Sequence, residues 1–170
     1  MYDIITMKEA KRNKVIFVCS GNICRSPMGE ALLKHAIAAT PKDDPVRNLE
    51  ICSAGTSTVD GIMPSAHSIK ALEKVGIDIS SYRSTALTQK LIDEAFAVFA
   101  MDFSHIDVMK SAFDNLPKRL FRVLDMADNT NRRDVPDPYG GDLPEYLEVR
   151  DDIASSISGI LKYLQNETKI

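Results

Sequence analysis

The chain lacks the features that mark secreted, metal-binding and membrane-spanning proteins. Its 170 residues include three cysteines, three histidines and no tryptophan. The number of cysteines is odd, which argues against a disulfide framework, and no Cys-x-x-Cys pair occurs that would indicate a zinc site. We therefore expect no metal and no cofactor. No apolar run is long enough to cross a bilayer, and charges interrupt residues 1–14, where a secretion signal needs an apolar core. We therefore expect a cytoplasmic protein with no membrane partner.

The chain also lacks a strong charge of either sign. Its formal net charge is -3, which leaves no broad basic face for a nucleic acid backbone, so no nucleic acid partner is expected. With 44% apolar residues, the length fits one compact domain. Residues 1–13 are polar and weakly patterned, which predicts a flexible N-terminal extension ahead of a folded domain at 14–170.

Strands and helices are predicted to alternate along this domain. Short apolar runs predict strands at 15–18, 49–53, 95–101 and 120–124. Helices are predicted from Ser26-Pro27 onward, at 65–75 and at 145–166, with a long ordered loop at 125–144. The pattern predicts an α/β fold: a single-domain, doubly wound (flavodoxin-like) parallel four-stranded sheet with helices on both faces. Cys19 and Asp137 follow the first and last strands, so both should lie at the sheet edge where ligands bind.

The segment from Cys19 to Arg25 joins a buried strand to the start of a helix. Backbone N–H groups are unpaired at such a position, and the helix dipole favours an anion. Gly21 and Asn22 tolerate left-handed backbone angles, so the loop can curl around a phosphate-sized group. The N–H groups and the helix dipole would also favour Cys19 as a nucleophilic thiolate, to which Ser26 would add a hydrogen bond. Arg25 would bind two phosphoryl oxygens. The alternative, non-catalytic interpretation is a buried structural cysteine beside a surface arginine.

A proton donor is needed for any ester leaving group, and Asp137 is the best candidate. Pro136 and Pro138 flank it and restrict the backbone of the loop. Asp-Pro is also a common turn former, which is the alternative interpretation. The aspartates at 125, 128 and 134 are further candidates that we interpret as solvated loop charges.

Five segments, in this order, resemble the low-molecular-weight protein tyrosine phosphatases. They are CSGNICRSPMGEAL, ICSAGT, VGIDISSYRSTALT, FAMD and VPDPYGG, and the resemblance covers about residues 14 to 165. It implies a metal-independent tyrosine phosphatase domain that hydrolyses phosphotyrosine proteins through a phosphocysteine intermediate, as a monomer or weak homodimer. Cys19 becomes the nucleophile, Arg25 the transition-state clamp and Asp137 the acid. The substrate-binding set implied is Ser20, Gly21, Asn22, Ile23, Cys24, Ser26 and Tyr139.

Some residues depart from the family pattern or have two readings. Gly140 and Val59 stand near positions where an aromatic residue often lines the pocket, and Tyr82 replaces a histidine common in bacterial members. The resemblance implies that Cys24 traps an oxidised Cys19 as a disulfide; the alternative is a small residue that fills the loop. Cys52 is interpreted as a plain core thiol.

Three other functions compete with this interpretation. A phosphoarginine phosphatase of the same fold would be expected to carry threonine at the position of Ile23. An arsenate reductase needs further cysteines, and only Cys52 remains for that role. A non-catalytic phosphate-binding module would be expected to lack one of the three catalytic residues.

Overall fold

A four-stranded parallel sheet forms the centre of the computed structural model, which describes residues 11–128 and 130–169. Its strands are β1 (Lys14–Cys19), β2 (Glu50–Gly55), β3 (Ala95–Ala100) and β4 (Leu120–Arg122), in the order β2-β1-β3-β4. The chain passes from β1 to β2 on one side and then crosses to β3 on the other. The loops after β1 and β3 therefore diverge, which is where open α/β sheets bind ligands.

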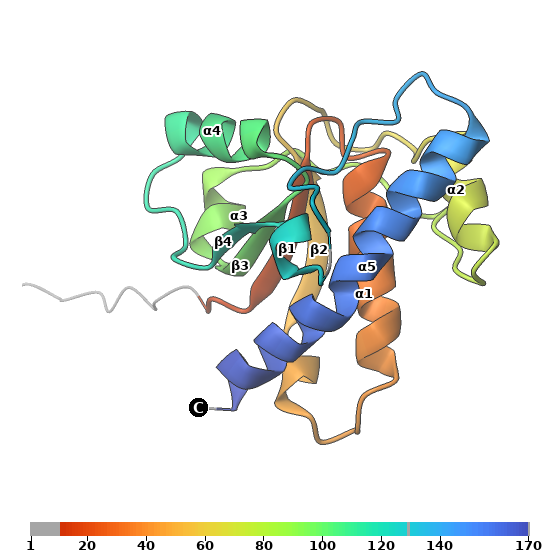
Figure 1. Ribbon diagram of the computed structural model, residues 1–170. Helices are drawn as coiled ribbons and strands as arrows, with labels where there is room; N and C mark the ends of the chain where they lie inside the picture. Colours follow the sequence, from red (N-terminus) through yellow and green to blue (C-terminus); the bar gives the residue numbers. More distant parts are fainter. Residues whose placement is uncertain (1–10, 129, 170) are drawn as a thin grey trace, which may run out of the picture.

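Helices cover both faces of this sheet, as predicted (Figure 1). On one face α1 (Arg25–Ala38) lies beside α5 (Leu143–Thr168), and α2 (Ala66–Glu73) contacts both. On the other face lie α3 (Gln89–Asp93) and α4 (Phe103–Ala112). Two short 3-10 helices, η1 (Pro45–Asn48) and η2 (Val123–Met126), complete the fold.

Successive residues of β1 point to opposite faces, and both faces are buried. Phe17 packs into the core beneath α1 and α5, whereas Ile16 and Val18 pack into the core beneath α3 and α4. All three side chains are fully buried. This explains why the strand reads as a continuous apolar run rather than as an alternating one. Phe17 also stacks on Phe99 of β3, with ring centroids 5.8 Å apart.

Several predicted boundaries were wrong. The fourth strand ends at Arg122 instead of 124, because the Asp125 carboxylate accepts the backbone N–H of Arg122 and turns the chain into η2. The last helix begins at Leu143 rather than 145, since the Asp142 side chain caps it by accepting the N–H of Glu145. The helices α3 and α4 were not predicted.

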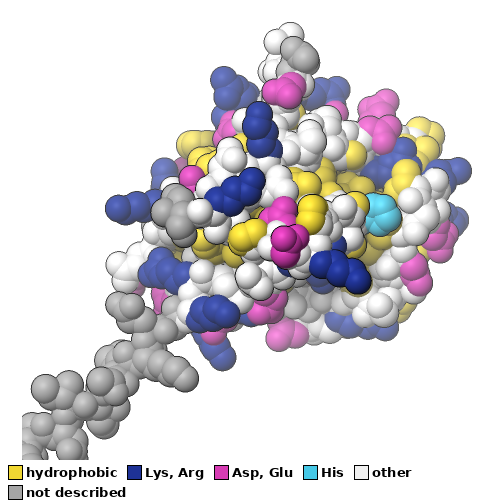
Figure 2. All heavy atoms as spheres, turned by 90° about the horizontal axis from the view of Figure 1, so that it is seen from below, with side chains coloured by type: hydrophobic (Ala, Val, Ile, Leu, Met, Phe, Trp, Pro, Cys, Tyr) yellow, Lys and Arg dark blue, Asp and Glu magenta, His cyan; other side chains and the backbone are white. Residues whose placement is uncertain are grey.

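The face of the molecule seen from below carries side chains of both charges (Figure 2). Figure 2 shows the face that lies below in Figure 1, where Lys and Arg side chains are interspersed with Asp and Glu. Residues 1–10 of the predicted N-terminal extension lie outside the described residues. Its last residue, Asn13, accepts the backbone N–H of Glu50 at 2.9 Å, next to the first pair of β1 and β2. Among the helices described, none combines the length and the hydrophobicity needed to cross a membrane.

Candidate active site

The loop from Cys19 to Arg25, the nucleophile loop, connects the end of β1 directly to the first residue of α1. Asn22 lies in the left-handed region with a φ of 53°, which bends the loop back on itself. This places the backbone N–H of Asn22 3.2 Å from Cys19 Sγ, to which it donates. The sequence prediction of a curled loop between strand and helix is confirmed.

Ser26 contacts the cysteine rather than capping its helix. Its hydroxyl lies 2.9 Å from Cys19 Sγ and accepts a hydrogen bond from Asn22 Nδ2 at 2.7 Å. A thiolate can only accept, so when Cys19 is ionised the Ser26 hydroxyl donates to its sulfur. The helix begins two residues earlier than its Ser-Pro start predicts, with Cys24 instead of Ser26 at the N-cap position. Both contacts on Cys19 stabilise negative charge on its sulfur.

Asn22 ties the nucleophile loop to the two neighbouring segments. Its Nδ2 also donates to Ser53 Oγ of β2 at 2.9 Å, and its Oδ1 accepts the backbone N–H of Thr85 at 2.9 Å. Ser53 in turn donates to Glu30 of α1 at 2.5 Å. A buried amide with every hydrogen-bonding group satisfied holds the left-handed bend in place.

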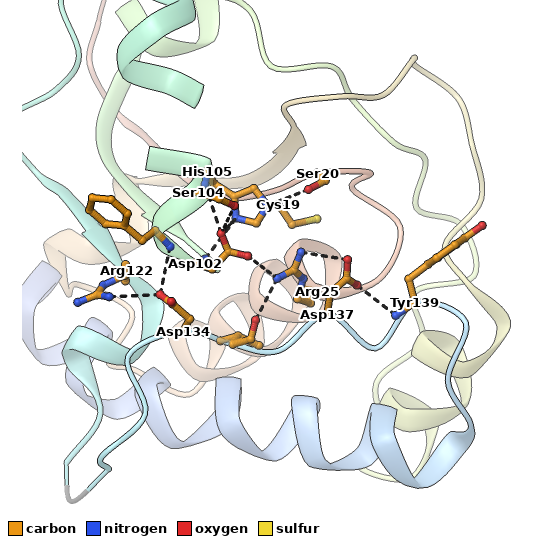
Figure 3. Close-up of polar contacts among 12 residues, drawn as sticks. Cys19, Ser20, Arg25, Asp102, Ser104, His105, Arg122, Asp134, Asp137 and Tyr139 are labelled. Atoms are coloured by element: carbon orange, nitrogen blue, oxygen red, sulfur yellow. Dashed lines mark hydrogen bonds and ion pairs between the residues drawn. The ribbon is translucent and has the colours of Figure 1, made fainter. Parts of the chain in front are cut away.

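Arg25 is 3% exposed and its guanidinium is fixed from two sides. Nη1 donates to Asp102 Oδ2 at 2.9 Å and to the carbonyl oxygen of Val135 at 3.0 Å. Nη2 lies 3.5 Å from Asp137 Oδ2 (Figure 3). Both of these hydrogen bonds are made by Nη1. They orient the planar guanidinium and leave the N–H groups of its other nitrogens available to a ligand.

Asp137 and Tyr139 come from the loop that precedes α5. Asp137 Oδ1 accepts the backbone N–H of Tyr139 at 3.1 Å, and its carboxylate faces the Arg25 guanidinium (Figure 3). The Asp137 side chain is 54% exposed and that of Tyr139 is 74% exposed. The prediction that Cys19 and Asp137 meet at one edge of the sheet is confirmed, since both line the same pocket.

This pocket, the Cys19 pocket, has a volume of about 240 Å³. That is below the roughly 300–1,000 Å³ typical of sites for drug-sized ligands, and suits a small group entering from outside. It is lined by Cys19, Ser20, Gly21, Ile23, Cys24, Arg25, Ser57, Asp137 and Tyr139. All were predicted except Ser57. Asn22 and Ser26, which were also predicted, do not line the pocket and instead brace the loop through the hydrogen bonds above.

Two residues that the sequence analysis missed support the pocket from behind. Asp102 follows β3 and caps α4, and His105 lies one turn further on. His105 Nδ1 accepts the backbone N–H of Asp102 at 3.2 Å, so the ring proton is on Nε2, which donates to Ser20 Oγ at 2.9 Å. The sequence does contain a pattern that could have predicted this helix start: an Asp at the N-cap position, followed three residues later by a side chain that can hydrogen-bond back to it.

The environment shifts the pKa of both residues. Burial lowers the pKa of His105, and the nearby Asp102 opposes this only in part. Burial disfavours the charge on Asp102, but hydrogen bonds from Ser104 and Arg25 outweigh it and lower the pKa of that carboxyl. A neutral imidazole and an ionised carboxylate therefore lie side by side at neutral pH.

The other loop aspartates do not face the pocket. Asp125 and Asp134 both pair with Arg122, at 3.4 and 3.2 Å, and Asp134 also accepts the backbone N–H of Phe103. Asp128 is exposed and does not line the pocket. Of the four candidate aspartates, Asp137 is the one that the fold brings to Cys19.

The three cysteines are free thiols in different environments. Cys24 Sγ lies 3.3 Å from the Tyr146 hydroxyl and 3.5 Å from Ser65 Oγ, and burial raises its pKa. Cys52 lies away from the pocket, and burial raises its pKa to about 12. Tyr82, the predicted departure from the family pattern, has its ring 5.3 Å from Lys34 Nζ.

Comparison with known proteins agrees with this geometry. The family model for low molecular weight phosphotyrosine protein phosphatase matches residues 14–170. A protein-arginine-phosphatase from Geobacillus stearothermophilus is 33% identical over 154 residues, covering 91% of this chain and 97% of that protein. The low molecular weight protein-tyrosine-phosphatase PtpA of Staphylococcus aureus is 32% identical over 157 residues, covering 92% and 96%.

Solved structures give the same result. The arginine phosphatase from Geobacillus stearothermophilus superposes with a TM-score of 0.78 at 32% identity, over 92% of this chain and 95% of that one. A low molecular weight protein tyrosine phosphatase from T. tengcongensis also gives 0.78 at 32% identity, over 88% and 98%. The chain belongs to the low molecular weight phosphotyrosine protein phosphatases, a family of cysteine-dependent, metal-independent enzymes.

Proposed function

We propose that this chain is a protein tyrosine phosphatase that works through a phosphocysteine intermediate, with Cys19, Arg25 and Asp137 as its catalytic residues. The observation that carries the proposal is their convergence on one pocket. Cys19 Sγ accepts hydrogen bonds at its base, and the Asp137 carboxylate lies 3.5 Å from the Arg25 guanidinium beside it. A nucleophile, a cation and a proton donor around a phosphate-sized space are what in-line phosphoryl transfer requires.

In the first step the Cys19 thiolate attacks phosphorus, and the bond from phosphorus to the ester oxygen breaks. Asp137, in its protonated form, gives its proton to that oxygen, so the alcohol leaves neutral. The N–H groups of the nucleophile loop and the free edge of the Arg25 guanidinium hold the phosphoryl oxygens as charge shifts between them. Asp102 and the Val135 carbonyl keep Arg25 oriented through its Nη1.

In the second step water attacks the phosphocysteine. The ionised Asp137 takes a proton from the water, the bond from phosphorus to sulfur breaks, and inorganic phosphate leaves. Cys19 returns as a thiolate, stabilised by Ser26 and the N–H of Asn22. The partial exposure of Asp137 gives the attacking water a route to the intermediate.

The walls of the pocket favour an aromatic ester. Ile23 contributes an apolar wall and Tyr139 an exposed aromatic ring at the mouth, so a phenyl ring would be held by both. A phosphoserine side chain is shorter and would leave its phosphorus too far from Cys19. We therefore propose phosphotyrosine proteins as substrates, acted on in the cytoplasm by a monomer or weak homodimer.

Phosphoarginine proteins are the second candidate. The relatives named above include both arginine and tyrosine phosphatases at nearly equal identity. Against this candidate stands Ile23, whose branched apolar side chain lines the pocket and offers a guanidinium no hydrogen bond.

The test is hydrolysis of phosphotyrosine, phosphoserine and phosphoarginine peptides in reducing buffer with a chelator. We expect phosphotyrosine turnover to exceed phosphoserine turnover by orders of magnitude. Cys19→Ser should abolish it, whereas Cys52→Ser, which removes a thiol outside the pocket, should retain it. Activity that survives Cys19→Ser, or a preference for phosphoarginine, would contradict the proposal.

A further inference from the structure

A second hollow adjoins the Cys19 pocket and is open to the surface. It has a volume of about 540 Å³, and its lining residues are Gly21, Ile23, Ser57, Thr58, Val59 and Ile62. Three residues line both the pocket and the hollow: Gly21, Ile23 and Ser57. They form a shared rim at which the two spaces meet. We call the side chains of Ile23, Val59 and Ile62 the apolar shelf.

Two residues of the apolar shelf, Val59 and Ile62, are unusually exposed for their kind, whereas Ile23 is partly buried. Val59 is 66% exposed and Ile62 is 43% exposed, and the neighbouring Met63 is exposed as well. Contiguous apolar surface of this kind marks a binding surface more often than chance, because water contacts it at a free-energy cost that a ligand removes.

The shelf is rigid because its loop is hydrogen-bonded on both sides. Buried Ser84 fixes the outer part: its hydroxyl donates to the Val59 carbonyl at 2.6 Å and accepts the N–H of Ile62 at 2.9 Å, and its own N–H donates to the Ile62 carbonyl at 2.8 Å. The Gly61 N–H also donates to the Ser84 carbonyl at 2.9 Å. Exposed apolar side chains are thus presented in a fixed arrangement, which lowers the entropy cost of binding.

The same loop is bonded to the nucleophile loop. The N–H groups of Thr56 and Ser57 donate to the carbonyls of Cys19 and Ser20 at 2.9 and 3.0 Å. At its far end the N–H of Ser65 donates to the Ile23 carbonyl at 2.8 Å. Figure 1 shows this loop leaving β2 at the edge of the sheet where β1 also ends. The shelf therefore has a fixed position relative to Cys19.

The lining of the hollow offers no ion-pair partner for a charged ligand. None of its lining residues is charged. The nearby Asp60 is directed elsewhere, since its carboxylate accepts the backbone N–H of Ala86 at 2.8 Å. A charged side chain placed on the shelf would lose water and gain no ion pair, so an apolar one is favoured.

We propose that the apolar shelf binds an apolar side chain that flanks the phosphorylated residue of the substrate protein. The inference rests on the proposed function, because that function places the phosphoryl group at Cys19. A polypeptide whose phosphoryl group occupies the Cys19 pocket passes over the rim of that pocket as it leaves. Gly21, Ile23 and Ser57 form the part of the rim that is shared with the hollow of the shelf. The shelf thus makes the enzyme selective for sequence around the phosphorylated residue.

The experiment compares phosphotyrosine peptides that carry Leu or Ser at each position within two residues of the phosphotyrosine. For the wild type we expect kcat/KM to be about tenfold higher with Leu at one of these positions, chiefly through a lower KM, as burial of part of a leucine side chain implies. The variant Val59→Ser/Ile62→Ser should reduce that ratio to near one. Val59→Thr, which keeps the side-chain shape, should reduce it by about half.

Val108→Ser is the matched control. Val108 is an exposed valine on α4 that lines neither space, so its variant should keep the wild-type Leu-to-Ser ratio. Turnover of phenyl phosphate separates two kinds of failure. An enzyme inactive on phenyl phosphate contradicts the proposed function itself. An active enzyme with no Leu preference, or one whose preference survives Val59→Ser/Ile62→Ser, overturns the shelf alone.

Discussion

The imidazole of His105 donates a hydrogen bond to the hydroxyl of Ser20, with Nε2 2.9 Å from Oγ. This bond joins the first turn of α4 to the nucleophile loop, 85 residues earlier in the chain. Since the backbone N–H of Asp102 fixes the ring tautomer, Ser20 accepts from His105 and keeps its own hydroxyl hydrogen for the pocket. A buried neutral histidine therefore helps to shape the wall that faces the substrate.

This arrangement predicts a pH-dependent stability. Burial lowers the pKa of folded His105 below its ordinary value of 6.5, so the unfolded chain binds a proton more readily. The stabilisation is complete above about pH 6.5 and is lost as the pH falls toward the folded pKa. Between pH 7.5 and 5.5, the free energy of unfolding should fall more for the wild type than for His105→Asn. Equal pH slopes in chemical denaturation would contradict the assignment.

Asp102 should matter for catalysis without touching the substrate. Asp102→Ala removes the carboxylate that accepts from Arg25 Nη1, and we expect kcat to fall by about ten- to hundredfold, as for a hydrogen bond between charged groups. Asp102→Asn still caps α4 and should lose less. Circular dichroism should show both variants folded. An Asp102→Ala enzyme with wild-type kcat would show that Val135 alone orients Arg25.

The nucleophile loop could be predicted from sequence because its determinants are local. An apolar strand, a Gly-Asn bend and a helix start follow one another within a few residues, and the sheet-edge rule then brought Asp137 to Cys19. Asp102 and His105 escaped prediction because α4 has a weak apolar pattern, with Phe103 and Val108 left exposed. Their link to Arg25 and Ser20 depends on β3 lying beside β1, which strand order, not local sequence, determines. The start of α1 predicted from the Ser-Pro pair was wrong because the Ser26 hydroxyl contacts Cys19 Sγ instead of capping the helix.

Thiol alkylation should distinguish the three cysteines. Burial raises the pKa of Cys24, and that of Cys52 to about 12, so both should remain largely as unreactive thiols at pH 7. Cys19 carries the donors that favour a thiolate, and limited iodoacetamide should modify it first. Inorganic phosphate should protect it by filling the pocket. Peptide mapping by mass spectrometry measures the order, and modification of Cys52 ahead of Cys19 would count against a thiolate at Cys19.

Ile23→Thr should shift the choice between the two substrate classes. Threonine is smaller at the branch and supplies a hydroxyl that a guanidinium can bond, so phosphoarginine turnover should rise relative to phosphotyrosine turnover, by about tenfold in the ratio of kcat/KM. The measurement uses matched peptides on the wild type and the variant. Unchanged ratios would show that Ile23 does not set this preference.

The central claim, that Cys19 carries the phosphoryl group, is tested most directly by trapping the intermediate. In Asp137→Ala the second step lacks its base, so rapid quenching during turnover of an aryl phosphate should leave a phosphoryl group on the protein. Mass spectrometry should locate it on Cys19, and Cys19→Ala/Asp137→Ala, which has no nucleophilic atom at that position, should show none during turnover. A phosphoryl group on any other residue, or steady turnover by Cys19→Ser, would contradict the account.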